Sequence, residues 1–300
     1  MSSERRGTLY GIAAYAIWGL FPIYWPWLEP AGAVEILAHR ILWSLVFVVL
    51  LLVVGRRATR HLPRDRRRLS LLAAAGVLIA VNWGVYIWAV NHHHVLEGSL
   101  GYFVNPLVSV ALGVLVLGER LRRPQWAAVG VAGVGVVVLA VETGRPPWIA
   151  LTLAFTFGTY GLVKKVVGVG AVEGLTVETA TLAPVALAYV VIAGAHGTAT
   201  FTTHTVAHGF MLASSGVVTA VQLLLFAGAA AAVPLTRLGV LFYLNPTLQF
   251  LVGSAVQHEP LSTGRLVGFA LVWAALVVFT ADSLTHRRSQ LALTAEAAAA

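Results

Sequence analysis

The sequence contains no cysteine among its 300 residues, and only 11% of those residues are charged. The lack of cysteine excludes disulfide bonds, thiolate metal sites and cysteine nucleophiles. The scarcity of charge accompanies 58% hydrophobic residues and a mean hydropathy of +0.83, far outside the usual range of soluble globular domains. These proportions predict an integral membrane protein.

Motifs of common enzymes are also missing, since the sequence has no HExxH, GxSxG, phosphate-binding loop or acidic metal cluster. We therefore expect neither an enzyme nor a resident cofactor or metal. Three adjacent histidines, His92 to His94, do not form a defined tetrahedral metal site. The net charge of +8 comes from short basic runs between apolar segments, which is typical of membrane orientation signals and argues against nucleic-acid binding.

Long apolar segments fill most of the chain. A membrane-spanning helix needs about 20 predominantly apolar residues. Ten segments meet this demand and are joined by short connections, so the sequence predicts an all-α integral membrane protein. The expected spans are 7–27, 33–54, 69–91, 97–117, 124–141, 147–163, 172–193, 208–231, 235–256 and 261–283.

The distribution of basic residues predicts how these spans are oriented. Of the 20 lysines and arginines, all but Arg40, Arg145 and Arg265 fall on the side of the N-terminus when the spans alternate in direction. Since cytoplasmic loops carry the excess of lysine and arginine, we expect a multi-pass protein of the cytoplasmic membrane with both termini in the cytoplasm. Residues 285–300 are of low complexity and are expected to form a disordered cytoplasmic tail.

An internal repeat organises the chain. A shift of 140 positions places Asn105-Pro106 on Asn245-Pro246 and Asn82 on Gln222. A shift of 139 matches Trp18-Gly19 with Phe157-Gly158, and one of 143 matches Glu35 with Glu178. The repeat predicts two units of five spans, 1–141 and 147–284. Because five is odd, the units have opposite orientations, an inverted repeat typical of secondary transporters.

Pro106 and Pro246 are each expected in the middle of a span. A proline there lacks an N–H and frees a carbonyl one turn earlier, so it can kink the helix. Interrupted helices at corresponding positions of two halves point to a substrate site, although prolines also occur as simple packing kinks in membrane helices.

Amide and aromatic side chains surround the two prolines in sequence. Such groups suit a neutral or zwitterionic amphiphile better than a bare ion, but aromatic residues can also belong to the interfacial belt of a membrane protein. The candidate substrate-binding residues are Asn82, Trp83, Tyr86, Asn105, Gln222, Tyr243, Asn245 and Gln249.

Ionisable residues inside the spans are rare. Glu35 and His39 are one helical turn apart and within hydrogen-bond reach, whereas Arg40 points about 100° away around the helix. Glu178 has no basic neighbour in sequence. Since charges at membrane depth are costly, each residue either couples transport to protons or ties helices together. For Glu35 both roles stay open, and for Arg40 a helix-tying role through a carboxylate or free carbonyls is favoured.

Several stretches resemble the RarD group of the EamA family, in the drug/metabolite transporter superfamily. They include AYAIWGLFPIYWPWL, VEILAHRILWSL, NWGVYIWAVN, FGTYGLVKK and FYLNPTLQFL. The resemblance implies ten helices in two inverted repeats, with helices 1 to 4 and 6 to 9 around a central cavity. It also implies a permease that exports metabolites or drugs, and the group is associated by name with chloramphenicol sensitivity.

The combined expectation is a secondary transporter that exports small amphiphilic metabolites or drug-like compounds by alternating access. Its partners are a small-molecule substrate and the lipid bilayer. A non-transporting membrane scaffold or sensor, whose polar residues only join helices, is the alternative.

Overall fold

The computed structural model describes residues 3–54, 63–118, 122–142, 147–233, 241–259, 261–264, 266–271, 273–275, 277–278 and 281–282. Every secondary-structure element within these residues is helical, which confirms the expected all-α class. The elements are α1 (Ser3–Gly19), α2 (Phe21–Tyr24), η1 (Trp25–Leu28), α3 (Ala33–Val54), α4 (Arg66–Asn91), α5 (Val95–Leu117), α6 (Arg123–Glu142), α7 (Trp148–Val167), α8 (Ala171–Ala195), α9 (Thr200–Thr203), α10 (Val206–Ala232) and α12 (Leu244–Ala255). Further helical residues lie within 263–282.

Polar side chains and glycines define several helix ends. The Asp65 carboxylate accepts a hydrogen bond of 3.2 Å from the backbone N–H of Arg68 and so caps α4. The Thr205 hydroxyl caps α10 in the same way through His208. Gly118 and Gly168 end α5 and α7 with φ of 68° and 60°, a left-handed conformation that favours glycine.

The outer surface of the bundle is apolar. In the described residues, four helical segments are long and apolar enough to cross a membrane, namely Ala33–Val54, Arg66–Asn91, Val172–Ala195 and Val206–Phe226. Large hydrophobic side chains such as Leu115, Val141 and Phe210 are exposed on the bundle surface. A surface of this kind is one that lipid covers.

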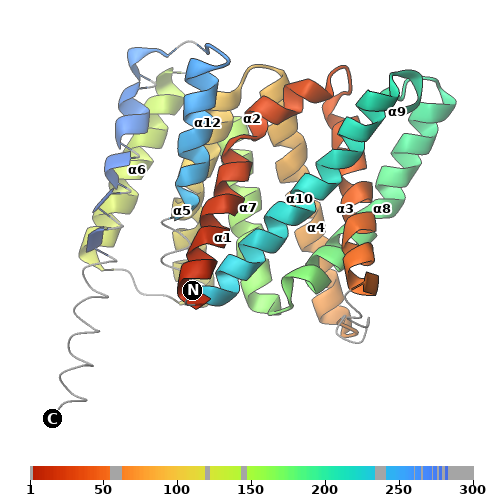
Figure 1. The fold of residues 1–300 in the computed structure, drawn as a ribbon. Helices are drawn as coiled ribbons and strands as arrows, with labels where there is room; N and C mark the ends of the chain where they lie inside the picture. Colours follow the sequence, from red (N-terminus) through yellow and green to blue (C-terminus); the bar gives the residue numbers. More distant parts are fainter. Residues whose placement is uncertain are drawn as a thin grey trace.

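Helices α1, α3 and α7 each pack between two other helices. Figure 1 shows α8 at one side of the bundle and α6 at the other, with α1, α7 and α10 between them. Helix α1 packs against α10 and α12, and α7 packs against α4 and α5. Helix α3 lies between α8 and α10, and α4 also contacts α8. Thus α1 and α7 occupy similar positions, each between two other helices.

Two of the expected spans differ from the structure. The expected span 7–27 is divided at Leu20 into α1, α2 and η1. Pro22 and Pro26 lie in the first turns of α2 and η1, where the missing N–H costs no helical hydrogen bond. In the expected span 235–256, residues 234–240 lie outside the described part, and α12 begins only at Leu244, after a turn at Tyr243.

Close backbone contacts occur where glycine leaves room. A Cβ atom built on Gly216 of α10 would lie 2.5 Å from the backbone nitrogen of Ser44 in α3. The Ser44 hydroxyl donates a hydrogen bond of 3.0 Å to the Gly216 carbonyl at the same crossing. At the α4–α8 crossing, a Cβ on Gly76 would lie 3.0 Å from the Glu178 carbonyl oxygen. Small residues thus let these helix pairs approach closely.

We expect Gly216→Ala to destabilise the protein by about 1–3 kcal/mol, because the added methyl group overlaps the backbone of α3. Gly133→Ala in α6 is the matched control, since a Cβ there meets no atom within 4 Å. Its melting temperature in detergent should equal or exceed that of the wild type. Equal melting temperatures for the two variants would contradict the close α3–α10 contact.

Candidate functional site

Arg40 is the most deeply buried charged residue near the centre of the bundle, with a relative exposure of 0%. It lies in the second turn of α3, and its Nε donates a hydrogen bond of 2.6 Å to the Thr219 hydroxyl of α10. Its Nη1 and Nη2 atoms are buried and have no hydrogen-bond partner among the described residues. Of the three guanidinium nitrogens, only Nε is therefore hydrogen-bonded to a described residue.

Aromatic rings enclose the Arg40 guanidinium group. Its Cζ atom lies 3.8 Å from the ring centroid of Trp83, 5.1 Å from that of Trp25 and 5.4 Å from that of Phe21. A cation within about 6 Å of an aromatic face is attracted by the ring quadrupole. The break of the first span into α1, α2 and η1 places Phe21 and Trp25 in these positions.

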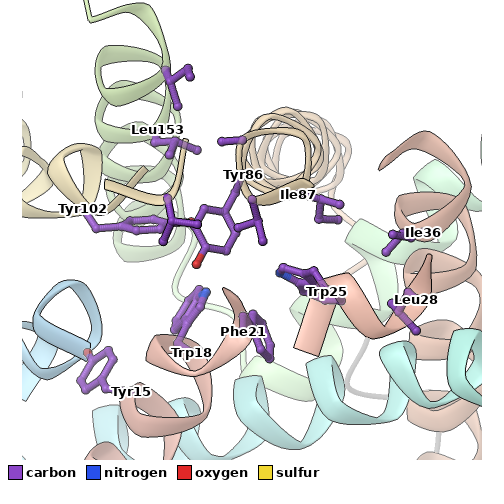
Figure 2. Packing of buried hydrophobic residues seen from close by; sticks show 14 of the residues in the cluster. Tyr15, Trp18, Phe21, Trp25, Leu28, Ile36, Tyr86, Ile87, Tyr102 and Leu153 are labelled. Carbon is purple, nitrogen blue, oxygen red and sulfur yellow. The ribbon is translucent and has the colours of Figure 1, made fainter. Parts of the chain in front are cut away.

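Further aromatic side chains extend this environment. Tyr24, Tyr86 and Tyr102 lie close enough to Arg40 to interact with it electrostatically. Figure 2 shows the Tyr86 hydroxyl and the indole nitrogens of Trp18 and Trp25 pointing into the same region. The Tyr86 hydroxyl and the Trp25 indole nitrogen have no partner among the described residues. The region therefore combines apolar rings with polar atoms that are free to bind.

Asn82, a predicted substrate-binding residue, is occupied by contacts within the protein. Its amide nitrogen donates to the Leu153 carbonyl and the Thr156 hydroxyl, both at 2.9 Å. Its amide oxygen accepts from the Tyr102 hydroxyl at 3.1 Å. Asn82 thus joins α4 to α5 and α7. Most of its hydrogen-bonding capacity is used within the protein, and little is left for a substrate.

The other predicted polar residues are buried and incompletely bonded. Within the described part of the chain, the Gln222 side chain has no partner for either polar atom, and the Asn105 side chain has none for its oxygen. Gln249 donates a hydrogen bond of 2.7 Å to Asn245, which leaves the Gln249 oxygen and the Asn245 nitrogen without partners among the described residues. Tyr243 is partly buried against the cluster of apolar side chains that contains Phe250.

The two predicted proline kinks differ. Pro246 is buried in the first turn of α12, immediately after the turn at Tyr243, so the helix is interrupted there. Helix α5 continues through Pro106 without a break. The described residues therefore contain the expected helix interruption next to Pro246 but not the one at Pro106.

The expected hydrogen bond between Glu35 and His39 is wrong. Glu35 accepts instead from the backbone N–H of Phe201 at 3.1 Å, which caps α9. His39 stacks on the Phe201 ring at a centroid distance of 4.5 Å, and neither of its ring nitrogens has a hydrogen-bond partner among the described residues. The helical spacing predicted their common face, but the neighbouring α9 provides a better partner for the carboxylate.

Glu178 does have a basic neighbour, contrary to the expectation from its own helix. Its Oε1 lies 2.6 Å from Lys164 Nζ of α7, and its Oε2 accepts a hydrogen bond of 3.2 Å from the Tyr160 hydroxyl. Glu178 is buried, whereas the Lys164 side chain is 24% exposed. This ion pair joins α7 to α8.

The sequence did not point to five residues that contact Arg40 or Glu178, namely Thr219, Phe21, Trp25, Tyr160 and Lys164. Thr219 carries no signal in the repeat, but the other four do. A signal was available, because Phe21 and Tyr160 are 139 positions apart, as are Trp25 and Lys164. Arg40 and Glu178, which they contact, are 138 positions apart. The contacts therefore match Glu178 with Arg40, whereas the shift of 143 matched it with Glu35.

Comparisons with known proteins agree on one family. Residues 5–141 match the EamA-like transporter family. Protein RarD of Streptomyces exfoliatus is 55% identical over 99% of this chain and 95% of its own length. The uncharacterized transporter YojE of Bacillus subtilis is 43% identical over 96% and 98% of the two chains. A chloramphenicol-sensitive protein RarD of Pseudomonas aeruginosa is 31% identical over 97% and 98%.

The fold also resembles a solved structure. A crystal structure superposes with a TM-score of 0.63 and covers 92% of this chain and 98% of its own. Its sequence identity of 17% limits the inference to the fold.

A double-mutant cycle tests the ion pair between Lys164 and Glu178. Lys164→Met alone leaves a buried carboxylate unpaired and should lower stability by about 3 kcal/mol, because the remaining charge has lost its partner. In the double variant, Lys164→Met with Glu178→Gln, the loss of stability should be smaller than the sum of the losses in the two single variants by about 0.5–3 kcal/mol. Thermal unfolding in detergent measures all four proteins, and strictly additive effects would contradict the pairing.

Proposed function

Since the chain belongs to the EamA-like transporter family and is a membrane transporter, we propose that it is a secondary transporter that exports small amphiphilic compounds. The observation that carries the proposal is a set of buried polar atoms that have no partner among the described residues, on Trp83, Tyr86, Asn105, Gln222, Asn245 and Gln249. Such atoms are costly in a membrane protein unless they bind something during function. A scaffold whose polar residues only join helices has no use for them.

We propose that residues 1–141 and 147–284 form two inverted five-helix repeats. The packing supports this: α1 contacts α10 and α12 of the second half, as α7 contacts α4 and α5 of the first. The contacts of Arg40 with Phe21 and Trp25 also match those of Glu178 with Tyr160 and Lys164. An inverted repeat allows one half to rock against the other and expose the site to each side in turn.

The substrate class follows from the residues around Arg40. Aromatic rings from α1, α2, η1, α4 and α5 favour a compound with an apolar or aromatic body. Amide groups on α5, α10 and α12 supply hydrogen bonds for its polar groups. The name of the Pseudomonas aeruginosa relative refers to chloramphenicol, so aromatic drugs of that type join small metabolites as candidates.

We further propose that a proton gradient drives export. Glu35 and Glu178 are the candidate carboxylates, since both are buried in helices that join the two proposed repeats. Lys164 and Tyr160 both bind the Glu178 carboxylate, so protonation of Glu178 would break its ion pair with Lys164. Glu35 only caps α9, which fits a structural role better.

Transport in liposomes tests the coupling. We expect purified protein to move substrate against its gradient when a proton gradient is applied, because inward proton flow drives the cycle. Glu178→Gln should lose gradient-driven transport but keep exchange of substrate for substrate, and Glu35→Gln should keep both. If Glu178→Gln retained the wild-type pH dependence, it would be excluded from coupling. If no compound moved in any condition, the scaffold alternative would be supported.

Labelling of single cysteines tests the proposed orientation in the cytoplasmic membrane. The chain lacks cysteine, so Ser3→Cys and His92→Cys each introduce one thiol. An impermeant maleimide applied to intact cells should label His92→Cys, in the loop between α4 and α5, and should label Ser3→Cys only after lysis. The reverse pattern would contradict cytoplasmic termini.

A further inference from the structure

The Arg40 guanidinium group carries a positive charge, and the described residues around it offer it a single hydrogen bond. Arginine has five N–H donors, and buried ones normally bind carboxylates or carbonyls. Here Nε binds the Thr219 hydroxyl, while Nη1 and Nη2 have no partner in the described residues. The aromatic rings of Trp83, Trp25 and Phe21 stabilise the charge but accept no conventional hydrogen bond.

The described acidic residues that lie inside the bundle are bound elsewhere. Glu35 caps α9 through Phe201, and Glu178 pairs with Lys164. Glu259 accepts hydrogen bonds from the backbone N–H groups of Val95 and Leu96 at the start of α5. In the described part of the chain, none of these carboxylates forms an ion pair with Arg40. The described part of the chain therefore supplies no counter-charge for Arg40, and a bound anion can provide one.

We propose that the exported compound carries a carboxylate group, which binds Nη1 and Nη2 of Arg40 while its apolar body packs against the surrounding aromatic rings. The proposal rests on the transport function proposed above and names its substrate class as amphiphilic monocarboxylates. It replaces the expectation of a neutral or zwitterionic substrate that the amide residues suggested. Arg40 thus becomes a binding residue.

The geometry favours a carboxylate over a phosphate. Two adjacent guanidinium nitrogens match the two oxygens of a carboxylate in a bidentate pair. A phosphate carries more charge and needs a further cation, but Lys164 is already paired with Glu178. Trp18, Trp25 and Tyr86 direct polar hydrogens into the same region and can complete the coordination of the carboxylate oxygens (Figure 2).

Burial is consistent with this role. Arg40 is closed off on all sides in this structure, so the carboxylate reaches it only when the two halves separate. Alternating access provides that separation on each side of the membrane in turn. An unpaired charge in the closed, unloaded protein is costly, and this cost disfavours closure without substrate.

Metabolite export by cells tests the proposal. Cells that produce the wild type, Arg40→Gln, Arg40→Lys or no transporter are compared by untargeted analysis of medium and cytoplasm. We expect the compounds exported only with the wild type to be mainly monocarboxylates, and Arg40→Gln to reduce their export about tenfold or more. Arg40→Lys keeps the charge without the planar fork and should be intermediate.

Arg122→Gln is the matched control, because Arg122 pairs with Asp282 at the surface and has no place in the proposed site. It should export as the wild type does. Transporter-dependent compounds that are uncharged or cationic, or wild-type export of acids by Arg40→Gln, would overturn the carboxylate proposal. If the transporter changed no compound, the proposed transport function would itself fail, and the carboxylate proposal with it.

Two measurements on purified protein separate binding from a structural role. Matched pairs of acid and amide, such as indole-3-acetate with indole-3-acetamide and 3-phenylpropionate with its amide, are compared by the rise in melting temperature they cause. We expect the acids to stabilise the wild type more than the amides and to have no such advantage in Arg40→Gln. Equal stabilisation by acid and amide in every pair would overturn the proposal.

Without any probe, Arg40→Gln should melt at or above the wild-type temperature, because it removes an unpaired buried charge. A fall of roughly 5 °C or more would instead assign Arg40 to holding α3 and α10 together and overturn its binding role.

Discussion

A positive charge buried among aromatic rings, with a hydroxyl as its hydrogen-bond partner, is the central constraint on this structure. A guanidinium group in a membrane interior needs counter-charges or hydrogen-bond acceptors. The free-energy cost of burying it rises when these are missing. The break between α1 and α2 lowers the free-energy cost of burying this group, because it brings the rings of Phe21 and Trp25 against Arg40. Helix α10 contributes Thr219, and the tight crossing at Gly216 brings α10 close enough to do so.

The buried carboxylates of the described residues all have partners, whereas two nitrogens of the buried Arg40 have none there. Glu35 and Glu259 bind backbone N–H groups at the starts of α9 and α5, and Glu97 binds that of Ile149 at the start of α7. Anionic side chains are stabilised at such helix N-termini. Glu178 and Lys164 neutralise each other. The bonded carboxylates thus join helices, while the Arg40 cation has one hydrogen bond and aromatic neighbours but no counter-charge among the described residues.

The sequence predicted the helical, membrane-embedded class well, because apolar length and the spacing of basic runs depend on local composition. It also identified the buried amides, since Asn82 with Gln222 and Asn105 with Asn245 recur at a constant spacing. It failed where partners come from other helices. Helical spacing placed Glu35 beside His39, but packing supplies the Phe201 backbone; likewise Lys164, counted as a loop charge, reaches Glu178 from α7. The three-dimensional contacts gave meaning to the spacings of 138 and 139 residues, by which Arg40 and Glu178 hold matching positions.

A structure of the protein with an exported acid bound tests the role of Arg40 most directly. We expect carboxylate oxygens about 2.7–2.9 Å from Nη1 and Nη2 of Arg40, with the apolar body between the rings of Trp18, Trp25 and Tyr86. A bound compound that leaves both Nη atoms in contact with protein groups alone would contradict this role.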